Sequence, residues 1–269
     1  MDRTKPMCIS QTASTIIQLL GADSQKEAAP ALRPVLRKAR EQFGEAYCSR
    51  VFMYNPDAIA LWIFKKYREY FRPLLEMADV KLRLRSVFPP VTPVCFASMY
   101  TGLSPEQHGI VKYEKPVLEV PTVFDRLIRS DKKAAIVSTA GDSISEIFLD
   151  RTIDYYIYKK PEECNQKAME LIKEDQHDLI VLYNGNYDYY MHRFGPEGRL
   201  SINALKNNIR VYTQLEKQIR QFWAGHDSVL AFAPDHGCHR KYGLLGDHGI
   251  DEPCDMEVAH FYSLIRHSQ

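Results

Sequence analysis

The chain has 269 residues, of which 45% are hydrophobic and 26% are charged, a composition typical of a globular protein with a large core. Its 35 Lys and Arg residues are almost balanced by 34 Asp and Glu residues. This balance excludes a general attraction to duplex nucleic acid or to an acidic membrane, because such binding depends on a pronounced positive surplus. An anionic substrate must therefore be held by local groups. The composition carries no signal for oligomeric state.

Six cysteines are spread along the chain without CxxC pairs and without the density of a small disulfide scaffold: Cys8, Cys48, Cys95, Cys164, Cys238 and Cys254. They are interpreted as reduced thiols. The first thirty residues contain neither the apolar stretch of a secretory signal nor the run of about 20 apolar residues that crosses a bilayer. These features predict a cytoplasmic protein that does not bind a membrane.

The predicted elements begin with a helical preface over residues 12–44, where apolar residues recur at helical spacing. Residues 49–54 form the first predicted strand, which is short, apolar and rich in β-prone residues. A loop containing Asp57 follows, and then an amphipathic helix over residues 58–71.

Helix and strand then alternate three more times. Helices are predicted at residues 122–130, 161–175 and 201–223, and strands at residues 133–139, 178–183 and 228–233. This alternation is typical of an α/β fold with a mostly parallel sheet. Ligands of such sheets bind beyond the carboxyl ends of the strands.

No internal repeat, low-complexity tract or Gly/Ser linker marks a boundary within the chain. Residues 1–269 are therefore expected to form one domain, with the helical preface over residues 1–45 and the core over residues 46–269.

Three predicted strands are followed directly by groups that bind metal ions. Asp57 follows the strand at 49–54, Asp188 follows the strand at 178–183, and Asp235 and His236 follow the strand at 228–233. Carboxylates and neutral imidazoles are common ligands of Zn²⁺ and Mn²⁺, and strand ends hold them on a rigid scaffold.

Each of these motifs also has a purely structural interpretation. Asp188 and His192 lie on one face of a helix if the segment is helical, but the same spacing suits a solvated helix start. Asp235-His236 precedes Gly237, which lets the backbone approach a ligand or form a simple turn. His248 lies on a glycine-flanked loop where an isolated histidine is usually just exposed.

Thr92 lies between Pro90 and Pro93, directly before a predicted helix over residues 93–100. A hydroxyl at a helix N-terminus beside metal ions is well placed to act as a nucleophile on an anionic substrate. The structural alternative is a helix N-cap.

The segments around Thr92 are similar to those of a known family. Phe88-Pro89-Pro90-Val91-Thr92-Pro93 and the run from Thr101 to Val111, TGLSPEQHGIV, resemble the nucleophile segment of type I phosphodiesterases and nucleotide pyrophosphatases of the alkaline phosphatase superfamily. The later motifs follow in the order of that family, over roughly residues 50–264: Asp188, His192, Gly195-Pro196, Asp235-His236-Gly237 and His248-Gly249. The short preface resembles that of small bacterial cytosolic members.

The resemblance implies an alkaline phosphatase-like α/β/α sandwich with a minimal cap. It implies one metal ion on Asp188, His192 and His248, and a second on Asp57, Asp235 and His236 with Thr92. The two divalent ions would be Zn²⁺ first, with Mn²⁺ or Fe²⁺ as alternatives. Catalysis would pass through a phospho-threonine on Thr92.

Two positions depart from the family pattern. Related enzymes place an asparagine shortly after the HGI segment, where this chain has Lys112-Tyr113. These residues are candidates for binding the substrate, and a solvated lysine and a packed tyrosine are the alternatives. Asp57 precedes Ala58 where the family often has Asp-Gly.

The expected activity is hydrolysis of phosphate esters by two metal ions. A phosphodiester or nucleotide pyrophosphate is the first expected substrate and a phosphomonoester the next, so the partner is a small phosphate ester or nucleotide. A metal-dependent phosphomutase and a non-catalytic phosphate- or metal-binding relative are the alternatives. A sulfatase is excluded because Thr92-Pro93-Val94-Cys95-Phe96 lacks the arginine of the sulfatase motif.

Overall fold

The central feature of the computed structural model, which describes residues 6–23, 26–243 and 245–267, is a seven-stranded sheet. Its strand order is β2-β9-β6-β1-β5-β3-β4. The strands are β1 (Arg50–Pro56), β2 (Val80–Arg85), β3 (Ala134–Thr139), β4 (Asp154–Tyr158), β5 (Leu179–Asn184), β6 (Ser228–Phe232) and β9 (Glu257–Ile265). Only β9 runs against the others, since it pairs antiparallel with both β2 and β6. The prediction of a mostly parallel sheet is confirmed.

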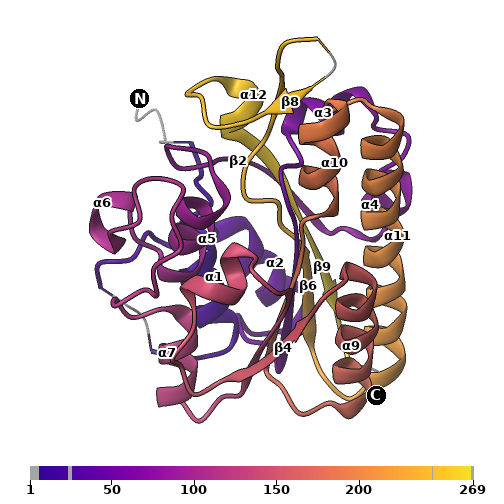
Figure 1. Ribbon diagram of the computed structural model, residues 1–269. Coiled ribbons are helices and arrows are strands. Elements are labelled where there is room, and N and C mark those ends of the chain that lie inside the picture. The colour runs from indigo at the N-terminus through magenta and orange to yellow at the C-terminus, as the bar shows by residue number, and fades with distance from the viewer. Residues whose placement is uncertain (1–5, 24–25, 244, 268–269) are drawn as a thin grey trace, which may run out of the picture.

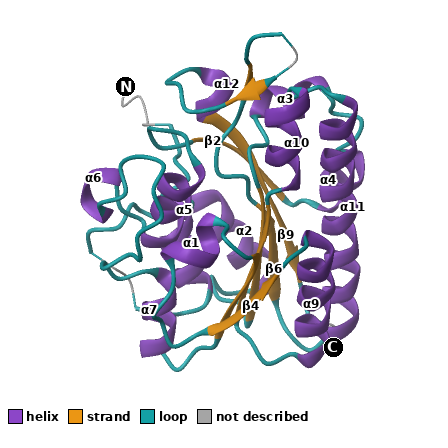
Figure 2. Ribbon diagram, viewed as in Figure 1, coloured by secondary structure: helices purple, strands orange, loops and turns teal. Residues whose placement is uncertain are grey.

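Helices cover both faces of this sheet (Figures 1 and 2). One face carries α1 (Gln11–Leu19), α2 (Arg33–Phe43), α5 (Thr92–Thr101), α7 (Val123–Arg129) and α8 (Ser143–Ile147). The other carries α3 (Leu61–Lys66), α4 (Arg72–Met77), α9 (Pro161–Glu174), α10 (Asn186–Phe194) and α11 (Arg199–Phe222). The short helices α6 (Pro105–His108) and α12 (Pro253–Met256) and the hairpin of β7 (His239–Arg240) with β8 (Gly246–Asp247) lie outside these layers. The expected α/β/α sandwich is confirmed.

Two apolar cores lie between the sheet and its helices. Alternate residues of β1 point to opposite faces, so Val51 and Met53 enter one core while Phe52 and Tyr54 enter the other. A strand that is buried on both faces is expected to be apolar throughout, which is why the central strands are visible in the sequence.

The helical preface predicted over residues 12–44 contains two helices, α1 and α2, and residues 24–25 lie outside the described residues. The prediction of one helix over residues 58–71 is wrong. Ala58 has φ +59°, which a helix cannot accommodate, and α3 starts only at Leu61 and is followed by a separate α4.

Among the described helices, none combines the length and the apolar character needed to cross a bilayer. All six cysteines are free.

Candidate active site

The three predicted strand exits meet at one edge of the sheet. β6, β1 and β5 are neighbours in the strand order and run parallel, so their carboxyl ends lie side by side. Asp57 follows β1 directly, Asp235 and His236 follow β6, and Asp188 lies in the first turn of α10 after β5. The expected convergence at the carboxyl ends is therefore observed.

One cluster consists of Asp57, Asp235 and His236, whose side chains are almost entirely buried. His236 Nε2 lies 3.4 Å from Asp57 Oδ1 and 3.4 Å from Asp235 Oδ2. Because neither aspartate is exposed, Asp235-His236 is not part of a simple surface turn.

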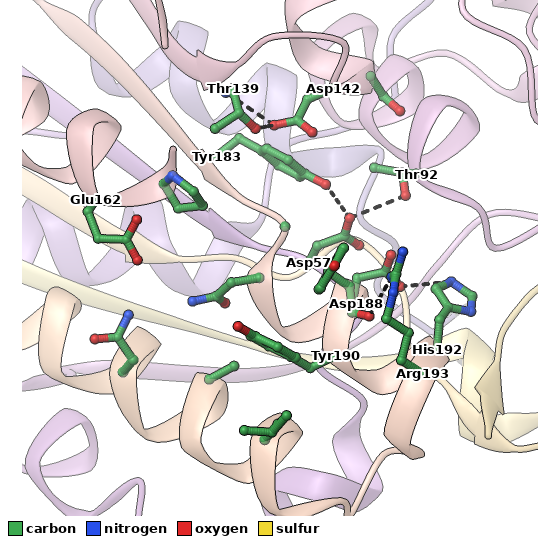
Figure 3. A pocket seen from close by; sticks show the side chains of 18 of the residues that line it. Asp57, Thr92, Thr139, Asp142, Glu162, Tyr183, Asp188, Tyr190, His192 and Arg193 are labelled. Atoms are coloured by element: carbon green, nitrogen blue, oxygen red, sulfur yellow. Dashed lines mark hydrogen bonds and ion pairs between the residues drawn. The ribbon is translucent and has the colours of Figure 1, made fainter. Parts of the chain in front are cut away.

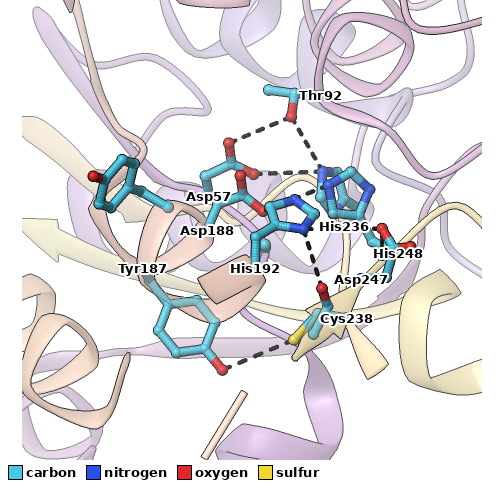
Figure 4. Close-up of polar contacts among 12 residues, drawn as sticks. Asp57, Thr92, Tyr187, Asp188, His192, His236, Cys238, Asp247 and His248 are labelled. Atoms are coloured by element: carbon cyan, nitrogen blue, oxygen red, sulfur yellow. Dashed lines mark hydrogen bonds and ion pairs between the residues drawn. The ribbon is translucent and has the colours of Figure 1, made fainter. Parts of the chain in front are cut away.

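A second cluster consists of Asp188, His192 and His248 and is half-buried. Asp188 Oδ1 lies 3.3 Å from His192 Nε2 and 3.5 Å from His248 Nε2. The ring of His248 lies between the clusters, since its centroid is 4.2 Å from that of His236 and 4.9 Å from that of His192. The two clusters are therefore adjacent (Figure 4).

All three histidines direct Nε2 into the clusters. Their Nδ1 atoms face backbone carbonyl oxygens, at 3.2 Å for His192 and Gly246, 2.9 Å for His236 and Gly237, and 3.1 Å for His248 and Pro90. A carbonyl oxygen can only accept, so each Nδ1 must donate its proton. This fixes the tautomer in which Nε2 carries the free lone pair, the arrangement found behind metal-binding histidines.

The carboxylates of both clusters direct buried oxygen atoms at these histidines. Asp57 Oδ1, Asp188 Oδ1 and Asp235 Oδ2 are buried and lack a hydrogen-bond partner among the described residues. Each instead faces an Nε2 atom at 3.3–3.5 Å, and ligands that are about 2.0–2.2 Å from a tetrahedral ion lie about 3.3–3.5 Å apart. Both donor sets therefore fit a divalent cation such as Zn²⁺.

The buried charges perturb one another strongly. Burial, followed by the charge of Asp188, raises the pKa of Asp57, and burial, followed by the charge of Asp57, raises the pKa of Asp235 well above its usual range. Burial lowers the pKa of His236, but Asp235 and Asp57 outweigh it and raise that pKa to about 9. Burial and then the charge of His236 lower the pKa of His248 to about 3. Without a metal ion, a proton on His236 therefore supplies some of the positive charge that a cation would bring to the cluster.

Thr92 is the first residue of α5 and is 5% exposed. Val91 occupies the N-cap and forms no side-chain cap, so the N-cap interpretation of Thr92 is wrong. Thr92 Oγ1 lies 3.4 Å from Asp57 Oδ2 and 3.3 Å from His236 Nε2. The hydroxyl therefore points at the buried cluster (Figure 4).

A cleft of about 760 Å³ opens above this group. Thr92, Asp57, Asp188 and His192 line it, and Figure 3 shows Glu162 across the cleft from them. Of the two residues expected to bind substrate, Tyr113 lines the cleft and is 62% exposed.

Lys112 is not among the residues that line the cleft and pairs with Glu114 at 3.3 Å. Lys115 lines the cleft in its place and donates to Gly141 O at 2.6 Å. The solvated-lysine alternative describes Lys112 as the structure has it.

Two residues of the cleft were not expected from the sequence. Tyr183, at the end of β5, donates a hydrogen bond from its hydroxyl to Asp57 Oδ2 and so orients that carboxylate (Figure 3). Asp142 follows β3 and accepts from Ser138 Oγ at 3.2 Å. Asp142 could have been identified by the same criterion as Asp57, because each of these aspartates follows a strand at the same edge of the sheet.

Close packing requires a glycine at position 237, directly after His236. A Cβ atom at this position would lie 2.1 Å from the carbonyl oxygen of Cys254 and 2.9 Å from Ala60 Cβ. We expect Gly237→Ala to lower the free energy of unfolding by about 2–3 kcal/mol, because the backbone must shift. Gly225→Ala is the control, since its Cβ would meet nothing within 4 Å. Equal urea unfolding midpoints for the two variants would contradict this explanation.

Part of the chain matches a family model of phosphoester-cleaving enzymes. Residues 62–140, which include Thr92, match the family model described as Type I phosphodiesterase / nucleotide pyrophosphatase. A search of curated proteins finds no match.

Solved structures share the fold at low sequence identity. Murine ectonucleotide pyrophosphatase / phosphodiesterase 5, inactive and in complex with AMP, is 16% identical with a TM-score of 0.56, over 71% of this chain and 58% of that chain. The human protein of the same name is 16% identical with a TM-score of 0.57, over 71% and 57%. A second murine structure is 17% identical with a TM-score of 0.53, over 71% and 58%. The chain thus spans less than two thirds of these structures.

The architecture is the α/β fold of the alkaline phosphatase type. The matched segment and the shared fold together confirm the resemblance to that superfamily, and the matched segment is that of type I phosphodiesterases and nucleotide pyrophosphatases.

Proposed function

We propose that this chain is a metal-dependent hydrolase of phosphodiester or nucleotide pyrophosphate bonds, with Thr92 as its nucleophile. One divalent cation is held by Asp57, Asp235 and His236 beside Thr92, and the other by the cluster of Asp188, His192 and His248. Zn²⁺ is the first choice, with Mn²⁺ or Fe²⁺ as alternatives.

The observation that carries this proposal is the position of the Thr92 hydroxyl. It lies at the N-terminus of a buried helix, 3.4 Å from Asp57 Oδ2 and 3.3 Å from His236 Nε2, and it lines the cleft. A threonine that merely packs or caps a helix has no reason to face two buried metal-binding groups.

The reaction has two in-line steps. Thr92 Oγ attacks phosphorus, the bond from phosphorus to the leaving oxygen breaks as the bond to Oγ forms, and the hydroxyl proton passes to the leaving oxygen. Water then attacks the phospho-threonine, the bond from Oγ to phosphorus breaks, and one proton of the water passes to Oγ. Bound cations supply Lewis acidity that lowers the pKa of the hydroxyl and offsets negative charge on the phosphoryl oxygens. Tyr183 keeps Asp57 oriented throughout, because its hydroxyl donates to Asp57 Oδ2.

The family model that matches the segment around Thr92 supports a phosphodiester or nucleotide pyrophosphate as the substrate. Lys115, Lys159 and Arg193 line the cleft and can offset the negative charge of its phosphoryl group. The murine neighbour crystallised with AMP supports a nucleotide as one substituent of the ester.

A substrate panel on metal-loaded protein tests the proposal. We expect hydrolysis of bis-p-nitrophenyl phosphate and of a nucleoside 5′-(p-nitrophenyl phosphate), at least about tenfold faster than hydrolysis of p-nitrophenyl phosphate. A chelator should abolish all activity and added Zn²⁺ should restore it, because the donor atoms alone provide no Lewis acid. Absence of turnover on every ester would reject the proposal. Isomerisation of a sugar phosphate without release of phosphate would identify a phosphomutase instead.

A further inference from the structure

A third group of metal-binding side chains lies outside the two clusters described above. His239 in β7 and Cys254 and Asp255 in α12 bring one nitrogen, one sulfur and one oxygen atom within 4.8 Å of one another. Figure 1 shows α12 and β8, the partner strand of β7, together at one end of the sheet.

The aspartate of this group is fixed before any ligand binds. Asp255 is fully buried, and its Oδ2 accepts a hydrogen bond from the backbone amide of Ile250 at 3.1 Å. His239 Nδ1 lies 2.9 Å from Asp255 Oδ1 and 3.0 Å from Oδ2. Both oxygens therefore face His239 Nδ1 at hydrogen-bond distance, and a bound cation would take the place of the proton that lies between them.

The group also joins the segments that carry two candidate catalytic histidines. The amide of Gly237, next to His236, donates to Asp255 O at 2.6 Å. His239 pairs in register with Asp247, next to His248. A ligand held by His239 and Asp255 would therefore tie both segments together.

Two roles that need no ion are the alternatives. In the first, His239 and the Cys254 thiol only hydrogen-bond to Asp255, and such a group would not bind Co²⁺ through a thiolate. A Cys254 nucleophile is disfavoured because burial and the charge of Asp255 raise the pKa of the thiol, whereas reactive cysteines have a lowered pKa.

We propose that His239, Cys254 and Asp255 form a third cation site for a borderline-soft divalent ion of the Zn²⁺ class. Mixed sulfur, nitrogen and oxygen donors favour Zn²⁺ over Mg²⁺ or Ca²⁺. Because His239 is 23% exposed and Cys254 is half-buried, solvent can fill the fourth position. The ion clamps α12 onto the segments that follow β6 and precede His248, so its role is to stabilise this end of the site.

Co²⁺ binding tests this site without measuring turnover. Co²⁺ substitutes for Zn²⁺, and a bond between Co²⁺ and a thiolate gives a near-ultraviolet charge-transfer absorption that carboxylate and imidazole ligands do not give. The two clusters proposed for catalysis contain no cysteine, so this absorption does not come from them. We expect metal-free wild-type protein titrated with Co²⁺ to develop the absorption to a plateau whose amplitude corresponds to one thiolate-bound Co²⁺ per chain, and added Zn²⁺ to remove it.

Variants of the half-buried residues identify the ligands. Cys254→Ser should abolish the absorption, and His239→Gln should weaken Co²⁺ binding at this site by about tenfold or more. Cys8→Ser is the matched control, because Cys8 is also a half-buried free thiol, and it should leave the absorption unchanged. No absorption in the wild type, or an absorption that survives in Cys254→Ser, would overturn the proposal. Either result is independent of whether the chain hydrolyses phosphate esters.

Discussion

Thr92→Ala is expected to lower kcat/KM for bis-p-nitrophenyl phosphate by about 10³–10⁵-fold, because it removes the atom that forms the covalent intermediate. The metal content should change little, since three side chains remain at each cluster. Kinetics and elemental analysis of the same preparation separate the two quantities. A loss of turnover together with retained metal is the signature of a missing nucleophile.

Two further variants make this result specific. Thr92→Ser keeps a hydroxyl and should retain measurable turnover and a trappable phospho-serine. Thr101→Ala removes the other buried threonine of α5, whose hydroxyl donates to Ala97 O at 2.7 Å, and should reduce stability but not kcat. If Thr92→Ala keeps more than about a tenth of the wild-type kcat/KM, less than about 1.4 kcal/mol of transition-state stabilisation has been lost, and Thr92 is not the nucleophile.

The central strands were predictable because they are buried on both faces and are therefore apolar throughout. β2 alternates buried Val80, Leu82 and Leu84 with exposed charged residues, which is the pattern of a strand with one solvated face, so this strand could also have been predicted from the sequence. β9 was missed because it contains buried polar residues. Ser263 and His260 are satisfied by Tyr212 and by the carbonyl of Pro234, and such distant partners cannot be recognised from local sequence.

The candidate site was likewise predictable from the sequence only in part. The three strand exits were visible in the sequence because a polar metal-binding group follows an apolar run, and parallel strands bring their carboxyl ends together. Asp57 lies beside Thr92 although it precedes Ala58 rather than a glycine. The contacts that orient the ligands were not visible. Tyr183 reaches Asp57 across 126 positions, and Pro90 O reaches His248 across 158.

Asp235→Asn is expected to lower metal-supported turnover and, at the same time, to stabilise the metal-free protein. Asn keeps an oxygen that can accept from the Ala58 amide, at 3.4 Å from Asp235 Oδ1 in the wild type. The substitution removes one of the two adjacent buried carboxylates, Asp57 and Asp235. A protonated His236 can neutralise only one of them. We expect turnover to fall by about 10²-fold or more, since a neutral amide is a much weaker metal ligand.

The pH dependence of stability separates this explanation from a general packing effect. Burial and the charge of Asp57 raise the pKa of Asp235 in the folded protein above its unfolded value of 3.8, so the folded state binds more protons than the unfolded state. Stability of the metal-free wild type should therefore fall as the pH rises from about 4 through the raised pKa. Asp235→Asn lacks this titration and should melt about 2–6 °C higher than the wild type at pH 8, corresponding to about 1–2 kcal/mol, with a smaller difference at pH 5. Thermal melts of both proteins, recorded in chelator between pH 5 and pH 8, measure this difference in melting temperature. A difference that does not grow with pH would mean that the buried charge of Asp235 costs the fold nothing, and that the cluster does not need a cation to offset it.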